Sequence, residues 1–260
     1  MSEQPEKPDK PEEKLAEGTL ISHLLELRDR LIRMCIAVGI AFLPCMGYSK
    51  EIFSFVAMPL MKKLTHGNSL IATDVMSTFM TPFKMSFFAA VLIAMPYILY
   101  QIWAFVAPGL YRHEKKFAVP LLVSSVVLFY AGIGFAYEFV FPVLFKFFAS
   151  ETPAGVSMMT DIQKYLDFVL RMFFAFGLAF EVPVAVVLLV SVGIVRLEKL
   201  KSIRGYVLIG CFVAATFVTP PDAVSQSIMA VPMYLLYEGG ILMATILMRN
   251  KGKPQPEQAT

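Results

Sequence analysis

The run Phe168-Val-Leu-Arg-Met-Phe-Phe-Ala-Phe-Gly-Leu-Ala-Phe-Glu-Val-Pro-Val-Ala-Val-Val-Leu-Leu-Val-Ser-Val192 carries only two charged side chains. It exceeds the roughly 20 apolar residues that a helix needs to cross a hydrocarbon core about 30 Å thick. Hydrophobic residues make up 57% of the 260-residue chain and charged residues only 17%. This composition departs from that of soluble domains. It predicts an integral membrane protein and argues against a soluble enzyme domain, a disulfide-built secreted module and a nucleic-acid binder.

Five further apolar runs have the length expected of membrane helices. They lie at residues 31–48, 83–105, 119–141, 206–218 and 224–248. Short polar connections separate them, which leaves little chain for a soluble domain. We therefore predict an all-α protein with six transmembrane helices in a membrane domain over residues 19–248.

Polar segments flank this predicted domain. Residues 1–18 are rich in Glu, Lys and Pro and predict a disordered cytoplasmic tail, and residues 249–260 a second cytoplasmic tail. The acidic start lacks the basic segment and apolar run of a cleavable signal peptide. From Thr19 or Ser22 onward, leucines recur at helical spacing opposite charged residues, which predicts an amphipathic helix at the membrane surface before the first span.

The distribution of basic residues predicts the orientation of the spans. Lys and Arg gather before the first span, between spans two and three, between spans four and five, and after the last span: Arg28, Arg30, Arg33, Arg112, Lys115, Lys116, Arg196, Lys199, Lys201, Arg204, Arg249, Lys251 and Lys253. The opposite connections carry fewer for their length. By the positive-inside rule, both termini are expected in the cytoplasm.

The fifth run, residues 206–218, is unusually short, about 20 Å at the helical rise. Thr219-Pro220-Pro221-Asp222 ends it, because proline cannot continue a helix. The sixth run is interrupted by Glu238-Gly239-Gly240. We predict that both helices are short and thin the bilayer locally; the alternative is that both extend and their terminal charges reach back to the interface.

Residues that could support catalysis or metal binding are missing from the spans. All three histidines, His23, His66 and His113, fall in loops or at the surface, and there is no H-E-x-x-H, G-x-S-x-G, C-x-x-C or Walker A pattern. Cys35, Cys45 and Cys211 lie in apolar stretches without the spacing of metal ligands or of a disulfide framework. We expect no enzymatic activity, no metal and no cofactor.

Two carboxylates stand out in the apolar part of the sequence. Glu181 lies near the middle of the fourth span, where a charge costs about 2.5–3.5 kcal/mol on the lenient insertion scale. It is a functional candidate, or it is protonated or hydrogen-bonded to a neighbouring helix and only holds the bundle together. Glu138, near the outer end of span three, is expected to be an interfacial carboxylate that reaches water.

Glu26 and Glu114 fall on the predicted cytoplasmic side, each amid basic residues. For Glu26 the alternative to a functional role is an ordinary ion pair with Arg30 one turn later, worth a few tenths of a kcal/mol. For Glu114 the alternative is a solvated loop charge. Periodicity alone does not decide between these alternatives.

Four segments of the chain resemble the TatC family, the multispanning core of the twin-arginine protein translocase. They are residues 23–31 (HLLELRDRL), 100–114 (YQIWAFVAPGLYRHE), 180–183 (FEVP) and 217–222 (FVTPPD). The resemblance extends from about residue 22 to residue 247. Glu138 and Arg171 depart from the pattern, since less charge is expected at their positions.

The resemblance implies a receptor for paired-arginine signal peptides in the bacterial cytoplasmic (inner) membrane. Such a receptor exports folded proteins with TatA-type and TatB-type single-span partners, in a multimeric complex surrounded by membrane lipid and driven by the proton-motive force. The positions implied for signal-peptide binding are Glu26, Arg28, Phe105 and Glu114. Those implied for transport or assembly are Pro59, Glu181, Asp222 and Gln226.

The chemistry of the two acidic positions agrees with this implied function. A guanidinium group presents a planar fork that a carboxylate accepts through two hydrogen bonds, which an ammonium group cannot imitate. Paired carboxylates could therefore prefer arginine to lysine. The competing hypotheses are a small-solute secondary transporter that uses Glu181 as its proton site and, least favoured, a membrane enzyme.

Overall fold

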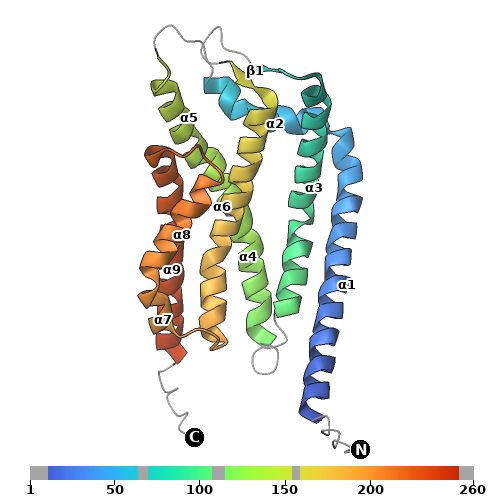
Figure 1. Ribbon diagram of the computed structural model, residues 1–260, viewed down its shortest axis with the longest axis vertical. Coiled ribbons are helices and arrows are strands. Elements are labelled where there is room, and N and C mark those ends of the chain that lie inside the picture. The colour runs from blue at the N-terminus through green and yellow to red at the C-terminus, as the bar shows by residue number, and fades with distance from the viewer. Residues whose placement is uncertain (1–10, 64–69, 107–114, 154–158, 252–260) are drawn as a thin grey trace, which may run out of the picture.

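The computed structural model describes residues 11–63, 70–106, 115–153 and 159–251. Within these ranges the protein is helical apart from one pair of very short strands (Figure 1). The helices are α1 (Pro11–Gly47), α2 (Ser49–Lys63), α3 (Val75–Val106), α4 (Lys115–Phe135), α5 (Phe141–Ser150), α6 (Ile162–Ser191), α7 (Leu197–Ser202), α8 (Arg204–Thr216) and α9 (Ala223–Lys251). The predicted all-α class is confirmed.

Five helices are long and apolar enough to cross a membrane. They cover Ile21–Gly47, Val75–Phe105, Val119–Ser150, Ile162–Ser191 and Ala223–Arg249. A sixth apolar helix, α8, has only 13 residues. Each predicted span thus corresponds to an apolar helix, and the short fifth helix is found where the prolines predicted it.

The boundaries differ from the predicted ones at two places. Helix α1 is one continuous helix from Pro11, so the helix takes in the end of the segment predicted as a tail and the surface helix merges with the first span. The third span continues to Ser150, because the π-helical turn η2 (Ala136–Val140) joins α4 to α5 without a loop. Glu138 lies in η2 and is exposed, but the span continues for another 12 residues, so Glu138 is farther from its outer end than predicted.

The helices run side by side in one bundle, with α2 at one end and α7 at the other (Figure 1). Helix α1 begins and α9 ends at the same end as α7. Helix α6 packs on α4 and α9, whereas α1 packs on α3. Half of the most apolar 18-residue stretch of α6 is buried, whereas only 6% of the corresponding stretch of α1 is buried. Helix α6 is therefore the centre of the bundle and α1 its outer helix.

Glycines set the distances between α6 and its neighbours. A Cβ atom on Gly132 of α4 would lie 2.5 Å from the backbone oxygen of Phe176. A Cβ atom on Gly177 of α6 would lie 2.6 Å from the ring of Phe129. Small residues let membrane helices approach closely and gain dispersion contacts. Gly132 and Gly177 thus bring α4 and α6 together.

The sixth apolar helix is long, which corrects the prediction of a short one. Helix α9 has 29 residues and runs without a break through Glu238, Gly239 and Gly240. Arg204 of α8 donates to Glu238 at 2.7 Å, and Tyr234 of α9 donates to it at 2.9 Å. The carboxylate therefore has hydrogen-bond partners on both helices. Gly240 packs against Pro183 of α6, where its Cβ would lie 2.9 Å from the proline Cα. These contacts explain why Glu238 and Gly240, which suggest an interruption in the sequence, lie within a continuous helix.

At the end of the bundle where α6 begins, Asp161 joins two connecting segments. Strand β1 (Leu70–Ile71) pairs in parallel with β2 (Thr160–Asp161). The Asp161 carboxylate accepts from the backbone of Gln163 and Lys164, at 3.0 and 2.9 Å, and so caps α6. It also accepts from the hydroxyl and backbone of Thr73. The Thr73 hydroxyl, followed by these backbone donors, lowers the pKa of Asp161 to about 2.

We expect Gly132→Ala to lower the free energy of unfolding by about 1–3 kcal/mol, because the added methyl group meets the backbone of α6. Thermal unfolding of the purified protein in detergent measures the change. The matched control is Gly134→Ala in the same helix, whose Cβ would meet nothing within 4 Å. An equal effect of both substitutions would show that helix propensity, and not the α4–α6 contact, determines the change in stability.

Asp161 predicts a dependence of stability on acid. Because its pKa is lower in the folded chain than its ordinary value of 3.8, the ionised carboxylate stabilises the fold above about pH 4. This contribution should disappear as the pH falls toward 2. The difference in melting temperature between the wild type and Asp161→Ala should therefore be largest near neutral pH and shrink in acid. Thr73→Val should flatten this dependence, and a constant difference would contradict the prediction.

Candidate functional site

The candidate site lies where the first half of α1 packs on the last turns of α3. Nε of Arg30 donates to Oε1 of Glu26 at 2.9 Å, and Nη2 donates to the same oxygen at 2.5 Å. Nη1 of Arg30 donates to Oε1 of Gln101 on α3 at 3.0 Å. The Gln101 residue is only 3% exposed. One guanidinium group thus connects a carboxylate on its own helix to a buried amide on the next.

An aromatic contact lies one turn away from this network. The rings of His23 and Phe105 stack with their centroids 4.3 Å apart and their planes 17° apart. His23, Glu26 and Arg30 share one face of α1, because spacings of three and four residues return to the same side of a helix. Gln101 and Phe105 share one face of α3 for the same reason. Two successive layers of side chains therefore fasten α1 to α3.

The other predicted peptide-binding residues do not join this network in the described part of the chain. Arg28 pairs with the neighbouring Asp29 at 2.8 Å, and both side chains are exposed. Two residues from Glu26, Arg28 lies on another face of α1. Glu114 falls within residues 107–114, which lie outside the described residues. The predicted pairing of Glu26 with Glu114 therefore stays a prediction.

The ion pair between Glu26 and Arg30 is the local alternative that the sequence left open. Gln101, in contrast, was missed. The signal for it was present, since an amide among the apolar residues Tyr100, Ile102 and Trp103 costs free energy unless it is hydrogen-bonded. Its partner on another helix could not be deduced from spacing.

Glu181 lies in a second polar network, between α3, α4 and α6. The Ser125 hydroxyl donates to Oε2 of Glu181 at 2.7 Å, and Nε1 of Trp103 donates to the Ser125 oxygen at 3.0 Å. Oε1 of Glu181 is buried and has no hydrogen-bond partner among the described residues. This bond to a neighbouring helix is the one that the alternative to a functional role expected. A role for Glu181 in transport stays a prediction.

Asp222 and Gln226 both stabilise the connection between α8 and α9. The Asp222 side chain accepts from the backbone N–H of Ser225 at 2.7 Å, which is the hydrogen bond of a helix N-cap. Nε2 of Gln226 donates to the hydroxyl of Thr216 at 3.0 Å and so ties α9 to the end of α8. Pro59, the other predicted transport residue, lies in α2, and its side-chain surroundings fall outside the described residues.

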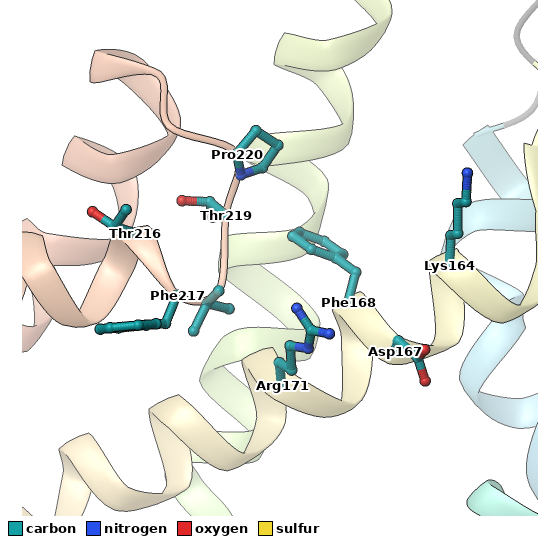
Figure 2. Close-up of a pocket in the computed structure, with 9 residues that line it drawn as sticks. Lys164, Asp167, Phe168, Arg171, Thr216, Phe217, Thr219 and Pro220 are labelled. Carbon is teal, nitrogen blue, oxygen red and sulfur yellow. The ribbon is translucent and has the colours of Figure 1, made fainter.

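A hollow of about 360 Å³ separates α6 from this α8–α9 connection. Figure 2 shows that Arg171 extends from α6 on the side of Thr219 and Pro220, while Asp167 points the opposite way. Asp167 instead pairs with Lys84 of α3 at 2.7 Å. The α8–α9 connection lines this hollow together with residues of the first turns of α6, from Lys164 to Arg171. The unexpected charge of Arg171 therefore faces a hollow.

The described residues contain no group of three or more His, Cys, Asp or Glu side chains that could hold a metal ion. Cys35, Cys45 and Cys211 are free thiols. The side-chain networks present are carboxylate, amide, hydroxyl and guanidinium contacts between helices. They are suited to binding and to holding helices together.

The fold and these networks define an all-α multispanning membrane protein with polar side chains at its helix contacts. Residues 22–232 match the family described as Sec-independent protein translocase protein (TatC). The chain belongs to the TatC family.

Individual relatives agree with this assignment. The TatC protein of Azotobacter chroococcum mcd 1 is 52% identical over 90% of this chain and 92% of its own length. That of Escherichia coli (strain K12) is 49% identical over 92% of both chains. A solved structure described as the crystal structure of the twin arginine translocase receptor TatC is 36% identical, with a TM-score of 0.80. The match covers 87% of this chain and all of that one.

The cap at Asp222 yields a testable prediction. Asp222→Ala should lower the free energy of unfolding by about 1 kcal/mol, because it removes the acceptor of the Ser225 N–H. Asp222→Asn should stay near the wild type, since asparagine caps helices as well as aspartate does. Thermal unfolding in detergent measures both. A loss of stability in the asparagine variant equal to that of the alanine variant would contradict the capping role.

Proposed function

We propose that the chain is the signal-peptide receptor and scaffold of a twin-arginine translocase, which exports folded proteins across the bacterial cytoplasmic membrane. The observation that carries the proposal is the Glu26 carboxylate. It accepts from two nitrogens of a guanidinium group, yet 39% of its side chain is exposed. Relatives named as translocase proteins, and a solved TatC described as a translocase receptor, support it.

Charge and geometry favour arginine as the group recognised at Glu26. Guanidinium is planar, always charged and weakly hydrated, so it can bind a carboxylate at a partly dehydrated helix contact. Each charge-assisted hydrogen bond contributes on the order of 1.5–3 kcal/mol. His23 and Phe105 provide an aromatic surface one turn away, against which the apolar part of a peptide can pack. Glu114 is the second acidic position of the proposed site, and Arg28 lies at its edge.

In this proposal the chain crosses the membrane six times, with α8 as the fifth span and both ends in the cytoplasm. Two observations support this orientation. Helix α1 begins and α9 ends at the same end of the bundle (Figure 1). The basic residues of α7 and of the first half of α1 lie at that end too. The positive-inside rule then places this end in the cytoplasm.

Export would require partners and an energy source outside the chain. We assign these roles to TatA-type and TatB-type single-span proteins in a multimeric complex and to the proton-motive force. Gln226 and Thr216, which meet at the exposed α8–α9 connection, are proposed to contact such partners. Glu181, Pro59 and Asp222 are proposed to act in transport or assembly. The named relatives are translocase components, which is a transport role, and they give no support to a small-solute transporter.

Peptide binding tests the proposal. The chain in lipid nanodiscs should bind a fluorescent peptide with paired arginines and bind the paired-lysine version more weakly. Glu26→Gln should weaken binding of the arginine peptide by about tenfold or more, which corresponds to the loss of one charge-assisted bond. Fluorescence anisotropy gives both dissociation constants.

The matched control is Glu51→Gln, an exposed carboxylate on α2 at the other end of the bundle. It removes the same charge and should leave binding unchanged. Equal binding of the arginine and lysine peptides, or unchanged binding by Glu26→Gln, would remove the receptor assignment. Transport of a small solute by the chain alone in proteoliposomes would favour the other class of protein.

A further inference from the structure

The carboxylate proposed to bind a signal arginine already holds an arginine of its own chain. Both short contacts of Arg30 to Glu26 end on the same oxygen, Oε1. No hydrogen bond to Oε2 is found within the described ranges. The Arg30 side chain is 18% exposed and that of Glu26 is 39% exposed. The internal guanidinium therefore lies deeper than the carboxylate that it binds.

Arg30 differs from the other two arginines of this part of α1. Arg28 is exposed and pairs with the adjacent Asp29, and Arg33 is exposed. Among the residues that the structure describes, only Arg30 of these three bonds to another helix, through Gln101. An arginine that only solubilised the helix surface would need no buried amide as a second partner. Gln101 thus gives the Arg30 guanidinium a second partner that does not depend on the carboxylate.

We propose that Arg30 is an internal occupant of the receptor site, which an incoming guanidinium group displaces from Glu26. This inference rests on the proposed function. In the free receptor Arg30 neutralises Glu26. When a signal arginine binds, Glu26 exchanges one guanidinium for another, and Arg30 keeps its bond to Gln101. Gln101 suits this role because its neutral amide accepts from Arg30 without competing as a second anion.

The exchange sets a threshold for binding. During the exchange, two guanidinium groups lie near Glu26, and like charges repel. A ligand must therefore make good contacts with Glu26 before it displaces Arg30. The cost of breaking the internal pair is the same for every ligand that takes Glu26. It therefore lowers all such affinities by one common factor and leaves their ratio unchanged.

Removing the internal occupant should consequently tighten binding. We expect Arg30→Gln to bind the paired-arginine and the paired-lysine peptide about threefold to tenfold more tightly than the wild type, by the same factor for both. Anisotropy titrations of the full chain in nanodiscs measure the two constants. In a Glu26→Gln background, the same substitution should change neither constant.

Gln101→Leu provides a second variant with the opposite expected sign. Leucine fills the buried position but cannot retain the displaced Arg30, so both peptides should bind more weakly than to the wild type. In the presence of Arg30→Gln this effect should vanish, because no guanidinium remains to be held. The charge-matched control is Arg33→Gln, which removes an exposed cation three residues away on the same helix.

The outcomes separate this inference from the proposed function. Weaker or unchanged binding by Arg30→Gln, with Glu26→Gln still defective, would overturn the displacement of Arg30 but leave the receptor standing. Tighter binding by Arg33→Gln of the same size would also overturn it, since net charge would then explain the gain. Normal binding by Glu26→Gln would remove the receptor assignment itself.

Discussion

Helix α6 can lie close to both α4 and α9 only because glycines stand at the points of contact. Gly132 and Gly177 bring α4 within backbone distance of α6, and Gly240 does the same for α9 against Pro183. In a bilayer, burial from water contributes little to helix association, so close packing and interhelical hydrogen bonds must supply the stability. These three contacts set the spacing of α4, α6 and α9. The close approach of α4 to α6 also lets Ser125 reach Glu181.

The last turns of α3 connect the two polar networks. Gln101 and Phe105 face α1, while Trp103, two residues from each, faces Ser125 and α4. Helix α1 is barely buried, so its position depends strongly on its contacts with α3. The site around Glu26 and the network of Glu181 therefore contact different faces of the same short stretch of α3. A peptide that displaced α1 would act on the segment that also carries Trp103.

Sequence patterns predicted those features that depend on neighbours along the chain. Length and hydropathy gave the six apolar helices, the prolines after Val218 gave the end of α8, and i, i+4 spacing gave the pair of Glu26 with Arg30. The length of α9 was predicted wrongly because the partner of Glu238, Arg204, is 34 residues away. For the same reason Gln101 was missed, since it meets Arg30 across 71 residues. The pairing of Glu26 with Glu114 and the surroundings of Pro59 stay predictions.

The π-helical turn between α4 and α5 has a consequence for the direction of side chains. A π-turn adds one residue to a helical turn, and each residue of an α-helix advances by about 100°. Side chains after Val140 therefore point roughly a quarter of a circle away from where an unbroken helix would aim them. This rotation lets one continuous rod send Phe129 to Gly177 below the turn and Phe141 to Phe173 beyond it. The continuous helix from α4 to α5 thus carries two differently oriented faces, each packed against a different level of α6.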